Sequence, residues 1–88
     1  MTHIHMYAAE GNLEKIECEL SKGTDINLRA EITGTTPLHR SVEIGHKEVV
    51  EYLLRHGANI YIIDNFNYSV LYLAVLGILK NVRNSQDM

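Results

Sequence analysis

The stretch GTTPLH at residues 34–39 decides the fold of this chain of 88 residues. Thr36 is a good helix N-cap, and Pro37 suits the first helical position because a backbone N–H there would have no partner inside the helix. The helix should end at Ile44, since the following Gly45 tolerates the left-handed backbone that terminates helices. The sequence therefore predicts a short helix over residues 37–44.

A second helix is predicted over residues 46–56, ended by Gly57. Residues 58–63 are partly β-branched and predict an extended segment, and Asp64 and Asn65 predict a turn. The unit is thus helix, turn, helix, β-turn. We expect its core to be centred on Leu38 and on the apolar stripe of the second helix, which consists of Val49, Val50, Leu53 and Leu54.

The same pattern occurs twice in the chain. Gly11 and Gly45 lie 34 residues apart, and each is followed by another glycine 12 residues later, at Gly23 and Gly57. In both copies, the residues after the leading glycine have a sequence pattern typical of a helix. A repeat of this length is typical of small helical units that stack on one another.

These residues resemble the ankyrin-repeat family, over a nearly continuous match from Gly34 to Asp64. The features that carry the resemblance are GTTPLH, Gly45-His46, Leu53-Leu54 and the GAN at residues 57–59. The chain departs from the family pattern at Ser41, which stands in place of alanine, and in one extra residue between Asn27 and Gly34. The resemblance implies an all-α ankyrin-repeat solenoid of about two and a half helix-turn-helix units joined by β-turn fingers.

We expect one domain over residues 1–88, divided into an N-terminal cap repeat (1–27), a full repeat (28–63) and a partial C-terminal repeat (64–88). The cap carries polar Lys15 and Glu19 in its stripe, as expected of an end repeat with an exposed outer face. In the third copy Gly77 comes one residue early, and no leucine pair or closing glycine follows. The last helix is therefore expected to be short or frayed.

The resemblance also implies a function, which is to bind another protein on the concave surface formed by the fingers and first helices. Phe66 and Tyr68 are the strongest candidates, because aromatic side chains and arginine dominate interface energetics. The alternative is that both rings only pack against the neighbouring turn. The full set of predicted partner-binding residues is Arg29, Glu31, Thr33, Thr35, Arg40, Glu43, Asn65, Phe66 and Tyr68.

A second functional class stays open, in which the chain is a structural or assembly unit. Its C-terminal side has no evident polar cap, and it is apolar at Leu71, Leu73, Val75, Leu76 and Leu79. Such a side usually marks an interface. Three explanations compete: the chain is a fragment of a longer array, it forms a homo-oligomer through this face, or its tail folds back over it.

Composition excludes several other classes. A formal charge of −3 disfavours binding to nucleic acid, which needs a positive surface. The start of the chain does not read as a signal peptide, and the longest apolar run, at residues 70–79, is far shorter than the roughly 20 residues of a membrane helix. Cys18 has no second cysteine to pair with. We therefore expect an intracellular protein with no membrane partner.

No motif indicates catalysis or a cofactor. A glycine-rich phosphate loop, a zinc-type cysteine pair and a nucleophile elbow are all missing from the sequence. His3 and His5 lie two residues apart but lack the further ligands of a metal site. The resemblance gives His39 a structural role, in which it ties loop backbones together by hydrogen bonds. The chain is thus predicted to be no enzyme, with no metal and no cofactor.

Overall fold

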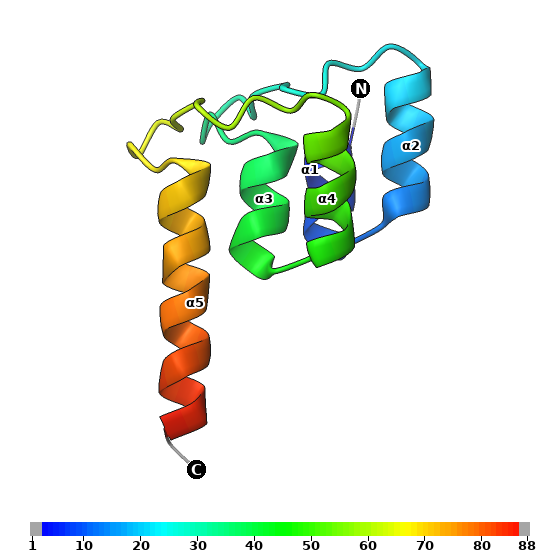
Figure 1. The fold of residues 1–88 in the computed structure, drawn as a ribbon. Helices are drawn as coiled ribbons and strands as arrows, with labels where there is room; N and C mark the ends of the chain where they lie inside the picture. Colours follow the sequence, from blue (N-terminus) through cyan, green and yellow to red (C-terminus); the bar gives the residue numbers. More distant parts are fainter. Residues whose placement is uncertain (1–2, 87–88) are drawn as a thin grey trace.

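The computed structural model describes the backbone of residues 3–86 and the side chains of residues 3–79. It contains five helices and, within those residues, no strand, so the predicted all-α fold is confirmed. The helices, labelled in Figure 1, are α1 (Ile4–Glu10), α2 (Leu13–Ser21), α3 (Pro37–Ile44), α4 (Lys47–Arg55) and α5 (Val70–Gln86).

The helices stand in two rows. α3 contacts α1 on one side and α5 on the other, which makes an inner row, while α2 pairs with α1 and α4 pairs with α3 in an outer row. Two long loops connect α2 to α3 and α4 to α5 at the same end of the rows (Figure 1). We call residues 22–36 the first finger and residues 56–69 the second finger.

The beginning of α3 is as the sequence predicts. The Thr36 hydroxyl accepts a hydrogen bond from the His39 backbone N–H (3.2 Å), and the His39 ring accepts one from the Thr36 N–H (3.2 Å). This reciprocal cap satisfies two N–H groups that the helix itself cannot satisfy. Gly45 has a φ of 95° and ends the helix. The bounds predicted for this helix are confirmed.

Only part of the predicted apolar stripe of α4 lies in the core. Val49 and Leu53 are 1% and 0% exposed, and they pack with Ile4, Ile16 and other side chains between the rows. Leu54, predicted at the centre, is 46% exposed, and that prediction is wrong. The physical reason is that α4 is the last helix of the outer row in the described chain, so its far side is uncovered. His46 and His56 are caps rather than helical residues.

One prediction about the end of the full repeat is wrong, and of the two expectations for the last helix, short or frayed, the first is wrong. The segment 58–63 contains a turn at Ile60 and Tyr61 instead of running extended throughout. α5 is not short: its 17 residues make it the longest helix, and it runs through Gly77 without a break. Glycine inside a helix costs about 1 kcal/mol relative to alanine, which strong helix formers on either side can offset.

Candidate functional site

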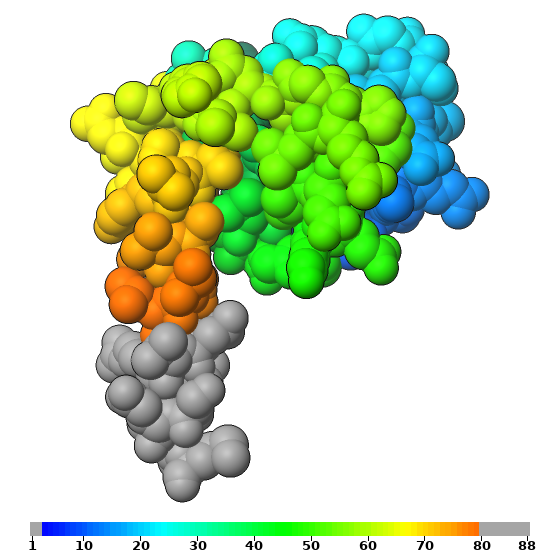
Figure 2. All heavy atoms as spheres, viewed as in Figure 1, coloured from blue at the N-terminus to red at the C-terminus, as the bar shows by residue number. Residues whose placement is uncertain are grey.

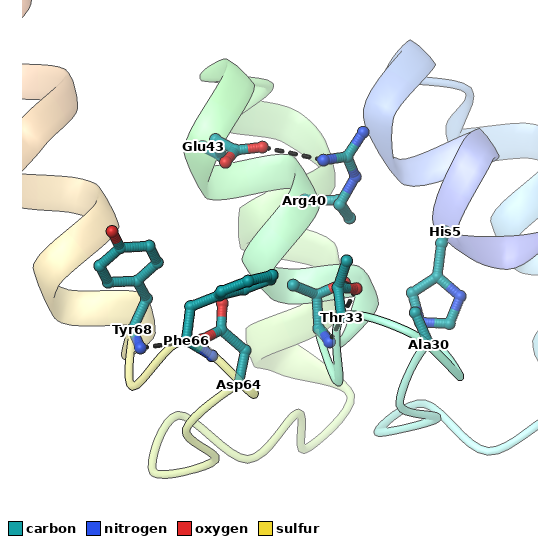
Figure 3. Close-up of a pocket in the computed structure, with 9 residues that line it drawn as sticks. His5, Ala30, Thr33, Arg40, Glu43, Asp64, Phe66 and Tyr68 are labelled. Carbon is teal, nitrogen blue, oxygen red and sulfur yellow. Dashed lines mark hydrogen bonds and ion pairs between the residues drawn. The ribbon is translucent and has the colours of Figure 1, made fainter.

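A hollow of about 550 Å³ lies between the two fingers and the exposed side of α3 (Figure 3). Six of the predicted partner-binding residues line it: Thr33, Thr35, Arg40, Glu43, Phe66 and Tyr68. His5, Ala30 and Asp64 complete the lining. The structure thus brings together, around one hollow, residues that are up to 63 positions apart in the sequence (5 to 68).

The second finger is built around the carboxylate of Asp64, which is only 6% exposed. Its Oδ1 accepts hydrogen bonds from the backbone N–H groups of Phe66 (2.9 Å) and Tyr68 (2.8 Å). The Asp64 N–H in turn donates to the Tyr68 carbonyl (3.0 Å), and Asn67 takes a φ of 66° to close the turn. This local hydrogen bonding fixes the backbone from which both aromatic rings project.

Phe66 and Tyr68 form an aromatic wall on one side of the hollow (Figure 3). Their ring centroids are 6.4 Å apart, and Tyr68 stacks on Tyr72 at 5.0 Å. The rings therefore do pack locally, yet Phe66 stays 59% and Tyr68 40% exposed. These local contacts hold the two rings in place but leave both of them exposed to solvent.

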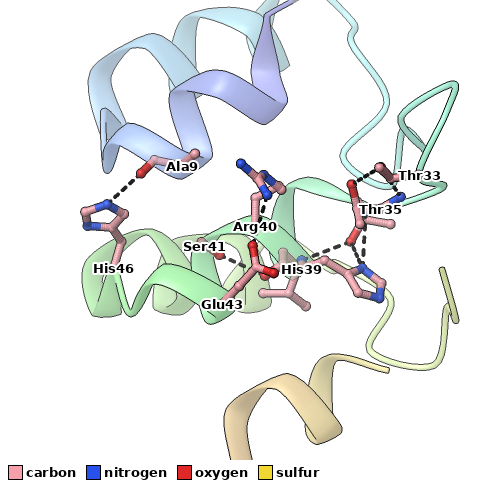
Figure 4. A network of polar contacts seen from close by, with 10 residues as sticks. Ala9, Thr33, Thr35, His39, Arg40, Ser41, Glu43 and His46 are labelled. Carbon is pink, nitrogen blue, oxygen red and sulfur yellow. Dashed lines mark hydrogen bonds and ion pairs between the residues drawn. The ribbon is translucent and has the colours of Figure 1, made fainter. Parts of the chain in front are cut away.

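The polar groups of the hollow satisfy one another. Arg40 and Glu43 form an ion pair on the exposed side of α3, with 2.9 Å between Nη1 and Oε1 (Figure 4). The hydroxyls of Thr33 and Thr35 lie 2.8 Å apart and share a hydrogen bond. Because exposed ion pairs contribute only about 0–1 kcal/mol, these groups can exchange their partners for those of a bound molecule at small cost.

Arg29 and Asn65 hold the two fingers together and do not line the hollow. Arg29 donates from Nε to the Gly34 carbonyl (3.0 Å) and from Nη2 to the Ile63 carbonyl (3.0 Å). Asn65 donates from its backbone N–H to Thr33 (2.8 Å) and from Nδ2 to the Ile32 carbonyl (2.9 Å). Glu31, the third predicted residue outside the hollow, is exposed in the first finger.

Three histidines act as structural ties. His39 is fully buried and donates from Nε2 to the Tyr68 carbonyl (3.1 Å), as the resemblance implied. His46, the N-cap of α4, reaches the Ala9 carbonyl (2.8 Å; Figure 4), and His5 reaches the Leu28 carbonyl (2.7 Å). The last two contacts were not foreseen. In the part of the chain that the structure describes, no three His, Cys, Asp or Glu side chains are grouped to hold a metal ion.

A second, apolar depression lies on the outer side, between α4 and the first half of α5. Figure 2 shows the surface hollowed there, between the green and the orange segments. One part, of about 510 Å³, extends from the second finger down to Ala74. A smaller part, of about 320 Å³, continues past Gly77 and Ile78 and includes the charged Lys47 and Glu51. We call both parts together the outer groove; Val42, Val50 and Ala74 line both.

The C-terminal side of the molecule is apolar and largely uncovered, as its sequence suggested. Leu73 is buried against the inner row, at 7% exposure. Leu71 and Leu79 are 73% and 53% exposed, and Val75 and Ile78 are exposed as well. No helix in residues 3–86 has both the length and the apolar character needed to cross a bilayer.

Comparison with known proteins identifies the family of this chain. The family model for ankyrin repeats (3 copies) matches residues 4–84. Among curated proteins, the chain is 33% identical over 72 residues to the inhibitor of Bruton tyrosine kinase of Homo sapiens, covering 82% of this chain and 5% of that protein. It is 37% identical over 70 residues to the palmitoyltransferase ZDHHC13 of Mus musculus (80% and 11%). It is 29% identical over 72 residues to the palmitoyltransferase AKR1 of Lachancea kluyveri (82% and 10%). The chain therefore spans only about a tenth or less of the length of these relatives.

Proposed function

This chain belongs to the ankyrin-repeat family, and we propose on that basis that it is a protein-protein interaction module that holds its partner in the hollow between the fingers and α3. The observation that carries the proposal is the aromatic wall, in which Phe66 and Tyr68 are supported by neighbours yet stay 59% and 40% exposed. Supported, exposed aromatic rings are typical anchors of binding surfaces, since little side-chain entropy is lost when a partner covers them.

The remaining lining suits a peptide or loop from another protein. Thr33 and Thr35 offer hydroxyls that both donate and accept, while Arg40 and Glu43 offer one charge of each sign. We propose that these residues have no catalytic role. We also propose that the partner is an intracellular protein. Because the chain has a formal charge of −3, nucleic acid and anionic membranes are less suitable partners than a protein.

The test is capture of partners from an extract of the native cell by the purified chain, read by quantitative mass spectrometry. The double variant Phe66→Ala plus Tyr68→Ala should reduce capture of a true partner roughly tenfold or more, because two anchor side chains are truncated. The matched control is Ile60→Ala plus Tyr61→Ala, which removes 44% and 83% exposed side chains of the same finger from the outer groove. The control should capture as the wild type does. Undiminished capture of every partner by the first variant would reject this site.

A second candidate function is self-association or docking of further repeats through the apolar C-terminal side. The observation that favours it is the exposure of Leu71 (73%), Ile78 (61%) and Leu79 (53%) beside the outer groove. Exposed apolar residues that gather next to an apolar groove usually mark an interface. This candidate uses a different face from the first, so the two can be tested separately.

A further inference from the structure

Asp64 is the exception among the polar groups of the hollow, because half of its carboxylate is unused. Its Oδ1 accepts the two backbone hydrogen bonds, from Phe66 and Tyr68, that shape the second finger. Its Oδ2 has no hydrogen-bond or ion-pair partner among the described residues. The whole residue is only 6% exposed, so this oxygen has lost most of its water. That loss is costly unless another polar or charged group replaces the water.

The unused oxygen of Asp64 faces the hollow. Within the described part of the chain, every buried side-chain oxygen or nitrogen that is sealed from solvent has a hydrogen-bond partner. Because Oδ2 has none, solvent must reach it, and Asp64 is one of the residues that line the hollow. Figure 3 shows its carboxylate beside Phe66, on the side of the hollow that the second finger forms. A molecule that enters the hollow can therefore reach this oxygen.

The aromatic neighbours of this oxygen also attract positive charge. The face of an aromatic ring is electrostatically negative, so a cation that lies over it is stabilised. Phe66 and Tyr68 are 59% and 40% exposed, and they follow Asp64 in the same turn. A cation bound to Oδ2 therefore has both rings close by. The carboxylate and the rings favour the same sign of charge.

The basic groups of the hollow do not neutralise Asp64. Arg40 pairs with Glu43, with 2.9 Å between Nη1 and Oε1, and Figure 3 shows this pair on α3, apart from Asp64. His5 directs its Nε2 to the Leu28 carbonyl (2.7 Å). Two carboxylates thus line the hollow against one guanidinium. With His5 counted as neutral, the hollow carries one negative charge that is not balanced.

Other occupants suit the hollow less well. The hydroxyls of Thr33 and Thr35 share a hydrogen bond (2.8 Å), and the guanidinium of Arg40 is already paired. An anion such as a phosphate would have to break these contacts and would also be repelled by Asp64. A neutral apolar side chain would cover Oδ2 without replacing the water that it loses. A cation with N–H groups satisfies both the oxygen and the rings.

We propose that the hollow recognises a basic side chain, arginine or lysine, that the partner protein presents in an exposed segment. The charged group donates a hydrogen bond to Asp64 Oδ2, and the aliphatic stem lies against Phe66 and Tyr68. The net charge of −3 attracts such a segment from a distance. The inference rests on the proposed function above, in which the hollow holds a partner, and adds the chemistry of that partner.

Selection of peptides tests whether the hollow prefers this chemistry. A phage-displayed library of random peptides is selected on the immobilised chain, and each selected peptide is then assayed on the variant Phe66→Ala plus Tyr68→Ala. Peptides whose binding depends on the two rings should share an arginine or lysine at one fixed position. If the ring-dependent peptides share no basic residue, this inference is overturned and the proposed function stands. If no peptide depends on the rings, both are overturned.

Asp64→Asn tests the role of the unused oxygen. Asparagine keeps an oxygen that can accept the two backbone hydrogen bonds of the finger, but it replaces Oδ2 by an amide NH₂ group. The variant should weaken the binding of a selected peptide at least about tenfold. It should weaken far less the binding of a peptide with a neutral analogue, citrulline for arginine or norleucine for lysine. Asp25→Asn is the matched control, because this exposed aspartate of the first finger also caps a turn; it should change neither affinity.

Two results of these binding assays would overturn the inference. Equal weakening of the charged and the neutral peptide by Asp64→Asn would mean that Asp64 acts only through the shape of the finger. Equal affinity of the two peptides for the wild type would mean that charge is not recognised. Circular dichroism shows whether Asp64→Asn is folded. If it is not, the two peptides on the wild type decide: a loss of about tenfold or more in the neutral peptide supports the inference, and equal affinity rejects it.

Discussion

Gly34 and Gly23 share a backbone that glycine adopts readily and other residues do not, but their surroundings differ. Gly34 has a φ of 72°, and a Cβ there would lie 2.6 Å from Asn65 Oδ1 and 2.9 Å from Arg29 Nη2. Gly23 has a φ of 97° and open space around it. The first glycine is thus required by conformation and by the junction of the two fingers, the second by conformation alone.

We predict that Gly34→Ala destabilises the chain more than Gly23→Ala does. A left-handed backbone costs a non-glycine residue about 1–2 kcal/mol, which applies to both. At position 34 the displacement of Asn65 and Arg29 should add roughly 1–3 kcal/mol. Equilibrium urea unfolding, followed by circular dichroism, measures both variants. Equal losses of unfolding free energy would mean that Asn65 and Arg29 can move aside without lowering the stability of the chain.

The histidines show what a residue pattern can predict. His39 lies in the GTTPLH stretch, and its structural role was implied by the resemblance of that stretch to ankyrin repeats. The role of His46 could not be inferred in this way, because its partner is the Ala9 carbonyl, 37 residues away across the stack. Contacts between repeats depend on how the units are superposed, and no local motif encodes that.

At the scale of elements, the fingers divide the predicted binding residues into two groups. The resemblance to ankyrin repeats placed all of them on one surface, formed by the finger tips and the exposed side of the first helices. It could not tell that Arg29 and Asn65 turn toward each other's finger while Phe66 and Tyr68 turn toward the hollow. In the second finger, the buried carboxylate of Asp64 orients the backbone from which Phe66 and Tyr68 project.

Arg29→Lys separates the two roles by experiment. An ammonium group on a single stem cannot replace a guanidinium that bonds to the Gly34 and Ile63 carbonyls at once. We expect a loss of about 1–2 kcal/mol in the free energy of unfolding, with partner capture retained. Arg55→Lys, exposed at the end of α4, is the control and should change neither quantity. If Arg29→Lys were as stable as the wild type and lost its partners, Arg29 would be a contact residue after all.

At the scale of the whole molecule, the sequence predicted the stack but not how it ends. The repeat of Gly11 and Gly45 fixed two helix pairs, and both are present. In the third copy Gly77 comes one residue early, and α5 continues through it. In the first two pairs the outer helix returns to bury residues such as Ile16, Val49 and Leu53. The third copy has no leucine pair after Gly77, so an outer helix that turned back there would bury few apolar side chains. The helix therefore stays continuous.

This end of the stack should make local stability depend on protein concentration. In a monomer, amides around Leu38, Val49 and Leu53 lie in the core and should open only with global unfolding, whereas the amides of α5 near Ile78 and Leu79, whose side chains are 61% and 53% exposed, should open locally. If two copies pair through α5, those amides become protected as the dimer forms. Hydrogen exchange read by mass spectrometry should therefore show slower exchange in peptides covering residues 78–86 as concentration rises. The peptide of α2 (Leu13–Ser21) serves as the internal control and should not change, because α2 lies at the opposite end of the stack. Exchange in residues 78–86 that is fast at every concentration would mean that α5 projects unpaired, and exchange that is slow even at high dilution would mean that the chain covers this half of the helix itself.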